Sequence, residues 1–120
     1  MSDLQPRGPK IELGGEEREL LFTLRAVDEI QDRFKKPVSE IVAMLGNAEG
    51  IYEVLPFLTA ALVTEGERKR DREPVTEDDV KGWVTVPMLS EVSRAILRSY
   101  GIAIPESDED NDPNATSRSS

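Results

Sequence analysis

The sequence predicts a mainly helical α+β fold, in which an N-terminal two-stranded β-hairpin is followed by about five helices in a small bundle. Two short segments of alternating apolar and polar residues flank Gly14 and Gly15, as in a hairpin with a tight turn. From residue 24 onward, apolar residues recur every three or four positions, which is typical of amphipathic helices. Prolines and glycines then divide the remaining chain into helix-length segments.

The hairpin is expected to pair a strand over residues 10–13 with a strand over residues 18–23. In the second strand, Leu20 and Phe22 would lie on one face and Leu21 on the other, because side chains alternate along a strand. An isolated hairpin is only marginally stable in water. We therefore expect it to pack against a helix.

The first two helices are expected over residues 24–36 and 37–46. Leu24 begins the apolar stripe of the first helix, and Pro37 ends that helix and opens the next. A third helix over residues 48–67 is apolar on much of its surface, so it is expected to be central, with a kink at Pro56.

The last two helices are expected over residues 77–83 and 87–100. Thr76 is a typical N-cap residue, and Asp79 is expected to complete the capping box only in part because it is shorter than Glu. Gly101 is expected to stop the fifth helix, with Ile102 packing back on the core. The residues expected in or near the core are Ile11, Leu13, Leu20, Phe22, Leu24, Val27, Ile30, Phe34, Ile41, Leu45, Leu55, Leu58, Leu62, Val80, Val92 and Ile96.

The chain divides into three parts by composition. Residues 10–104 are expected to form a single hairpin-plus-helices domain. Residues 1–9 form a leader and residues 105–120 an acidic tail. Both ends are expected to be disordered, since they lack the large apolar residues whose burial offsets the entropy of ordering.

The residue types give little support for catalysis. The chain contains no cysteine and no histidine, which removes the usual zinc ligands and the Cys–His and Ser–His nucleophile systems. No phosphate-binding glycine loop is present. Glu77, Asp78 and Asp79 are consecutive on a helix and would point in different directions, so they are interpreted as charges that stabilise a helix start. We expect a protein that is not an enzyme and has no cofactor or metal.

The charge also narrows the expected partners. The formal net charge is −9. The only basic cluster, Arg68–Arg72, has four cations, and residues 65–73 around it also contain four acidic residues. Nucleic-acid binding requires a surplus of cations, so nucleic acid is not the expected partner. No apolar segment approaches the roughly 18 residues of a membrane span.

Three motifs carry a resemblance to a known family. After the Gly14–Gly15 turn come the segments FTLRAVDEI (Phe22–Ile30), KPVSEI (Lys36–Ile41) and VTEDDV (Val75–Val80). In this order, and over residues 11–101, the chain resembles small tail assembly chaperones of long-tailed bacteriophages and prophages.

The resemblance implies a non-enzymatic protein that binds and solubilises the phage tape-measure protein and assists tail-tube assembly. It implies that the protein acts in the cytoplasm of the bacterial host and is absent from the mature virion. Self-association of the protein is compatible with this role. The expected partner-binding residues are Trp83, Val84, Val86, Met88 and Leu89, although Trp83 is equally consistent with packing on the core.

Two alternatives remain at this point. One is a small nucleic-acid-associated regulator that uses the Arg68–Arg72 region. The other is a further virion component, such as a connector or tube subunit, which would assemble into rings or tubes.

Overall fold

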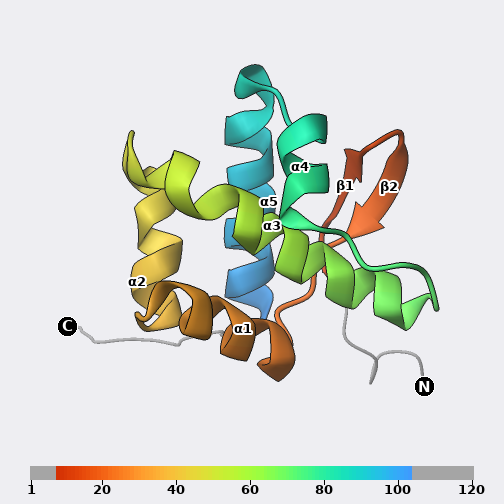
Figure 1. The fold of residues 1–120 in the computed structure, drawn as a ribbon, viewed down its shortest axis with the longest axis horizontal. Helices are drawn as coiled ribbons and strands as arrows, with labels where there is room; N and C mark the ends of the chain where they lie inside the picture. Colours follow the sequence, from red (N-terminus) through yellow and green to blue (C-terminus); the bar gives the residue numbers. More distant parts are fainter. Residues whose placement is uncertain (1–7, 104–120) are drawn as a thin grey trace.

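The computed structural model describes residues 8–103 and confirms the predicted fold class (Figure 1). Within residues 8–103, an antiparallel hairpin precedes five α-helices and two short 3-10 helices, η2 and η3. The elements are β1 (Lys10–Leu13), β2 (Glu16–Glu19), α1 (Leu24–Phe34), α2 (Val38–Ala43), η2 (Met44–Gly46), α3 (Gly50–Lys69), α4 (Glu77–Trp83), η3 (Val86–Met88) and α5 (Leu89–Ala103).

Helix α3 is the central element, as its apolar sequence predicted. It contacts α1, α4, α5, β2 and η2, and Figure 1 shows it crossing the molecule between them. Leu55, Leu58 and Leu62 are fully or almost fully buried along its length. The helix continues without interruption through Pro56.

The hairpin turn has the expected chemistry, but its second strand is shorter than predicted. Gly14 and Gly15 have φ values of 63° and 83°, which suit the tight turn between paired Leu13 and Glu16. β2 ends at Glu19, because the chain then leaves the hairpin to reach α3. The Leu21 amide donates to the Leu62 carbonyl at 3.2 Å, and Leu20 and Leu21 are both buried.

The described residues include only the last part of the predicted leader and none of the predicted acidic tail. The expected acidic tail, residues 105–120, and residues 1–7 of the expected leader lie outside the described residues. Pro9 accepts a hydrogen bond from the Leu20 amide at 3.0 Å, and the Gly8 amide donates to Glu19 at 2.8 Å. The bonding of the hairpin therefore extends two residues ahead of the start predicted at residue 10.

Helix α1 starts where predicted but buries a different stripe. The Thr23 hydroxyl accepts from the Ala26 amide at 3.1 Å and caps the helix. Ala26 and Ile30 face the core, whereas Leu24 is 89% exposed, so its predicted core position is wrong. Ala26, Ile30 and Phe34 are spaced by four residues, and this stripe points away from Leu24 on the helix. The other predicted core residues are buried or pack against the core, apart from Val27, which is half-buried.

The ends of α4 and α5 also differ from expectation. The Asp79 amide donates to the Thr76 hydroxyl at 3.0 Å, and the Thr76 amide donates to the Asp79 carboxylate at 3.1 Å, so an aspartate completes the capping box. Gly101 does not adopt positive φ, and α5 continues through it to Ala103. Ile102 is consequently 54% exposed and does not pack back on the core.

Gly66 marks the closest approach of α3 to the hairpin. A Cβ atom built on Gly66 would lie 2.2 Å from the carbonyl oxygen of Glu19, at the end of β2. The absence of a side chain at this position therefore lets the helix and the strand backbone touch.

We predict that Gly66→Ala destabilises the protein, although alanine is normally favoured over glycine inside a helix by about 1 kcal/mol. The new methyl group would force β2 away from α3 and disrupt a buried contact. Gly82→Ala in α4 is the matched control, because a Cβ there meets nothing within 4 Å. Urea unfolding should show a lower free energy of unfolding for Gly66→Ala only. Equal effects of the two substitutions would contradict the close contact.

Candidate partner-binding site

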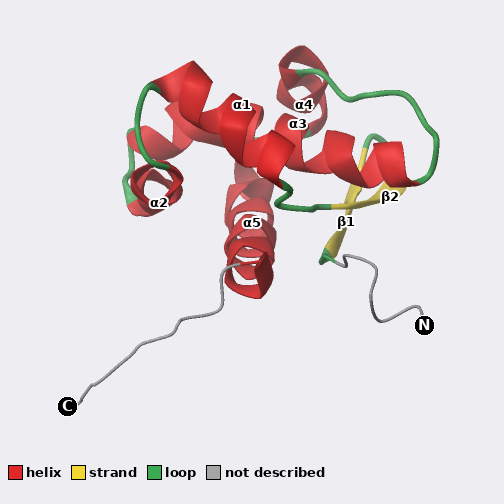
Figure 2. Cartoon of the chain, turned by 90° about the horizontal axis from the view of Figure 1, so that it is seen from below, coloured by secondary structure: helices red, strands yellow, loops and turns green. Residues whose placement is uncertain are grey.

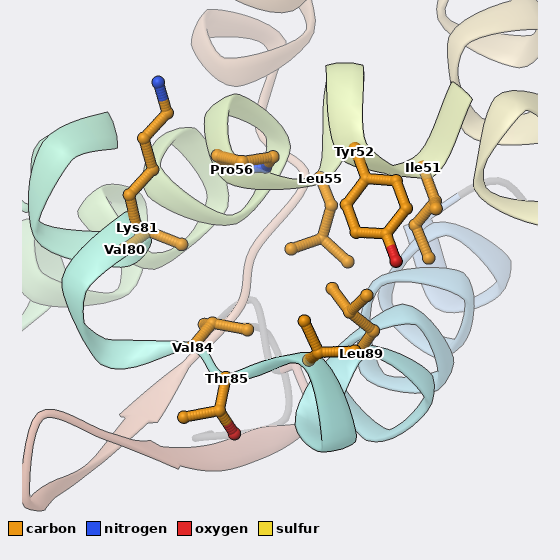
Figure 3. Close-up of a pocket in the computed structure, with 10 residues that line it drawn as sticks. Ile51, Tyr52, Leu55, Pro56, Val80, Lys81, Val84, Thr85 and Leu89 are labelled. Atoms are coloured by element: carbon orange, nitrogen blue, oxygen red, sulfur yellow. The ribbon is translucent and has the colours of Figure 1, made fainter. Parts of the chain in front are cut away.

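An apolar hollow of about 230 Å³ opens between α3 on one side and α4, η3 and the start of α5 on the other. Nine of its ten lining residues carry no charge. Figure 3 shows side chains of α3, such as Tyr52 and Leu55, facing Leu89 across the hollow. The lining residues are Ile51, Tyr52, Leu55, Pro56, Val80, Lys81, Val84, Thr85, Val86 and Leu89. We call this hollow the apolar groove.

The wall formed by residues 84–89 is built by local backbone geometry. Val84 and Thr85 are extended, with ψ values of 119° and 164°, and therefore separate α4 from η3. Pro87 is the second residue of η3, where its missing N–H costs no helical hydrogen bond. This arrangement leaves Val86 66% exposed at the rim of the groove.

The opposite wall is the N-terminal half of α3. Tyr52 is 60% exposed there, which is unusual for a large aromatic residue on a central helix. Pro56 has no N–H, so the Tyr52 carbonyl loses the donor that a helix normally supplies four residues later. The groove thus combines an apolar surface with the phenol ring of an exposed tyrosine.

The structure separates the five residues predicted to bind a partner. Val84, Val86 and Leu89 line the groove, whereas Met88 packs against the core and its sulfur lies 3.5 Å from the Thr85 amide. Trp83 lies against the hairpin turn, because its ring closely approaches Gly14 and lies under the Arg18 guanidinium at 4.5 Å. The tryptophan therefore fixes α4 to the hairpin and does not line the groove.

The groove residues of α3 were missed by the sequence analysis. Leu55 was predicted only as a core residue, and Ile51 and Tyr52 were not among the residues predicted to bind a partner. The signal that could have indicated them was Pro56 together with Tyr52, since both interrupt an otherwise regular buried helix.

The acidic start of α4 has structural partners. Glu77 forms an ion pair with Arg33 at 2.9 Å, and Asp79 caps the helix. Among the described residues, no group of three or more acidic residues is arranged to hold a metal ion.

The basic cluster at the end of α3 is largely occupied by ion pairs. Arg68 pairs with Glu65 at 3.2 Å, Lys69 with Glu19 at 2.9 Å, and Arg72 with Glu67 at 3.3 Å. Three of the four cations that could have bound phosphate therefore neutralise carboxylates of the protein itself.

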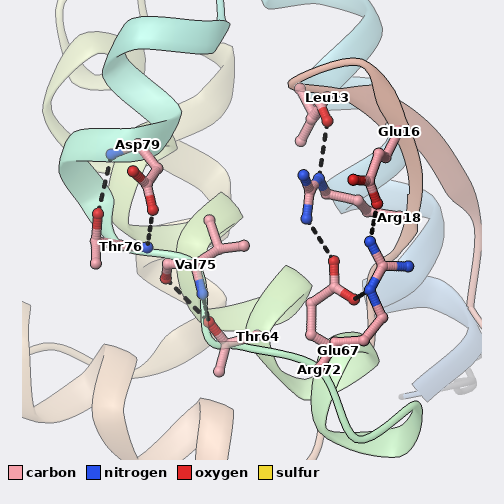
Figure 4. A network of polar contacts seen from close by, with 9 residues as sticks. All are labelled: Leu13, Glu16, Arg18, Thr64, Glu67, Arg72, Val75, Thr76 and Asp79. Atoms are coloured by element: carbon pink, nitrogen blue, oxygen red, sulfur yellow. Dashed lines mark hydrogen bonds and ion pairs between the residues drawn. The ribbon is translucent and has the colours of Figure 1, made fainter.

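Glu67 is the buried centre of this network. Its carboxylate is bound by the Arg18 guanidinium of β2 at 2.6 Å, and its side chain is 2% exposed (Figure 4). Arg72 contacts Glu67 and also Glu16 in the second strand. Arg18 in turn donates to the Leu13 carbonyl at 2.8 Å, so the network connects α3 to both strands.

Glu19 is the second acidic residue that connects the hairpin to α3. Burial opposes its ionisation, but the Lys69 ammonium, the Gly8 amide and the charge of Lys10 outweigh burial and hold the pKa of this carboxyl below its ordinary value. Glu19 is therefore ionised in the folded protein at neutral pH and stays paired with Lys69.

None of the helices within residues 8–103 is both long enough and apolar enough to cross a membrane. In comparisons with protein families, curated proteins and solved structures, no match to this chain was found.

We predict that Glu67→Ala lowers the free energy of unfolding by about 3 kcal/mol, because it leaves the Arg18 guanidinium buried without its carboxylate. Glu73→Ala is the control, since Glu73 is exposed and has no ion pair among the described residues. Chemical denaturation monitored by the fluorescence of Trp83, which lies beside Arg18, measures both variants. A loss for Glu67→Ala no larger than that for Glu73→Ala would show that the pair does not stabilise the fold.

Proposed function

We propose that this protein is a tail assembly chaperone of a long-tailed bacteriophage or prophage, and that the apolar groove binds a helical segment of the tape-measure protein. The observation that carries the proposal is the groove itself, an apolar hollow with exposed Tyr52 and Val86 at its rim. The order of the Phe22–Ile30, Lys36–Ile41 and Val75–Val80 motifs supports the same assignment.

The shape and chemistry of the groove suit an amphipathic helix. Such a helix binds a groove through apolar side chains spaced three or four residues apart. Lys81 is the single charged residue that lines the groove, and it favours a partner helix with an acidic residue at that end. The formal net charge of −9 would keep the complex dispersed while the apolar surface of the partner is covered.

This role places the protein in the host cytoplasm during tail assembly and outside the mature virion. Assistance to tail-tube assembly follows from the same proposal, because a tape-measure protein kept in solution is available to tube subunits. The proposal involves no enzymatic step and no cofactor.

The alternative of a nucleic-acid-associated regulator is disfavoured by the ion pairs of Arg68, Lys69 and Arg72. Binding to phosphates would have to break these pairs, and the affinity would fall steeply with salt. The alternative of a ring- or tube-forming virion component has no specific observation in its favour, and the hydrodynamic size of the protein would distinguish it.

We predict that co-expression with the tape-measure protein of the same genome raises the soluble yield of that protein, and that Tyr52→Ala with Val86→Ser weakens this effect. Removing a desolvated aromatic anchor typically costs about 2 kcal/mol, which is roughly a thirty-fold loss of affinity. Calorimetric titration with helical tape-measure fragments gives this affinity directly.

Leu24→Ser is the matched control, because Leu24 is also a highly exposed apolar residue but does not line the groove. It should leave both yield and affinity unchanged. A tape-measure protein that stays insoluble in the presence of the wild-type protein would contradict the chaperone function. A solubilising effect that survives the groove substitutions would contradict only the binding site.

A further inference from the structure

A second hollow, of about 190 Å³, lies between β1 and α5 and differs in character from the apolar groove. Lys10, Arg94 and Arg98 line it together with a single acidic residue, Glu91. We call it the cationic hollow. Lys10 also lines a neighbouring hollow with Lys69 and Arg70, where Glu19 pairs with Lys69.

The cations of this hollow differ from those at the end of α3, because most of the latter are bound to carboxylates of the protein. Within the described part of the chain, Arg94, Arg98 and Lys10 form no ion pair, whereas Arg68, Lys69 and Arg72 do. Arg94 and Arg98 are four residues apart on α5, and like charges at this spacing repel each other. The cationic hollow is therefore a local positive field on a protein with a formal net charge of −9, and it would be stabilised by an anionic segment.

The sequence supplies such a segment a few residues after the end of α5. Residues 106–112 contain five carboxylates and no cation, and they lie outside the described residues. The carboxylates are those of Glu106, Asp108, Glu109, Asp110 and Asp112.

The chain is long enough to connect the two. Helix α5 ends at Ala103, five residues after Arg98 and nine after Arg94, which corresponds to about 8 and 14 Å along a helix. The nine residues from Ala103 to Asp112 span up to about 30 Å when extended. Segment 106–112 can therefore turn back along α5 and reach both arginines.

We propose that segment 106–112 docks in the cationic hollow of its own chain through ion pairs with Arg94, Arg98 and Lys10. The docked segment shields the unpaired cations from other polyanions, including nucleic acid. The tail is then an internal counter-charge for one face of the protein, separate from the groove proposed to bind the tape-measure protein.

The test compares the amide NMR spectra of three full-length proteins at low ionic strength. In the double variant Arg94→Gln with Arg98→Gln, the amide signals of residues 106–112 should shift from their wild-type positions. The control is Lys36→Gln with Lys81→Gln, which removes the same charge from two exposed residues that do not line the cationic hollow. These control signals should stay at the wild-type positions.

Salt and dilution complete the experiment. In the wild-type protein, salt near 1 M reduces the Debye length to about 3 Å and should move the signals of residues 106–112 toward those of the arginine variant. The wild-type signals should not change on dilution, because the contact is within one chain. Identical tail signals in all three proteins would overturn the proposal, and so would tail shifts that disappear on dilution, which would indicate docking on a second copy.

Discussion

The contact between the hairpin and the C-terminal half of α3 is the constraint on which the other parts of the structure depend. Gly66 allows the two backbones to touch, and the buried Arg18–Glu67 ion pair fixes the strand on the helix beside that contact. The hairpin is too small to be stable alone, so α3 supplies the surface that stabilises it. Figure 2, which views the molecule at 90° to Figure 1, shows the hairpin beside one end of α3.

This contact also determines where the groove lies. Trp83 at the end of α4 packs against Gly14 and Arg18 of the hairpin, and residues 84–89 continue directly from it. One wall of the groove is therefore positioned through the hairpin, and the other wall is α3 itself. The Thr64 hydroxyl adds a second connection, because it binds both the amide and the carbonyl of Val75 just before α4 (Figure 4). Contacts that are distant from the groove therefore position both of its walls.

Local signals in the sequence predicted the elements well. The paired glycines predicted the turn, the change of apolar spacing at Leu24 predicted the start of α1, and the apolar surface of residues 48–67 predicted the central position of α3. The errors arose where tertiary contacts determine which residues are buried or where an element ends. Leu24 satisfies the helical spacing, yet the helix is rotated so that Ala26 faces the core instead. Likewise, β2 ends early because the Leu62 carbonyl of α3 captures the Leu21 amide, and no local pattern encodes that bond.

The candidate site was predictable only in part. Val84, Val86 and Leu89 line the groove. They lie in one short segment that the sequence analysis had already proposed as partner-binding. The α3 wall was hidden because Tyr52 belongs to a helix whose other apolar residues are mostly buried. The ion pairs of the Arg68–Arg72 cluster could not be predicted because they involve residues distant in the sequence. Lys69 pairs with Glu19 of β2. Arg72 pairs with Glu67, which also binds Arg18, a residue 49 positions before Glu67.

The central claim is that an apolar helical partner binds in the groove between α3 and residues 80–89. Hydrogen–deuterium exchange of the full-length protein, alone and with soluble tape-measure fragments, tests it most directly. The account predicts slower exchange on binding in residues 51–56 and 80–89, with the hairpin amides of residues 10–19 unchanged. Protection confined to the hairpin or to α1, with no change along the groove, would contradict it.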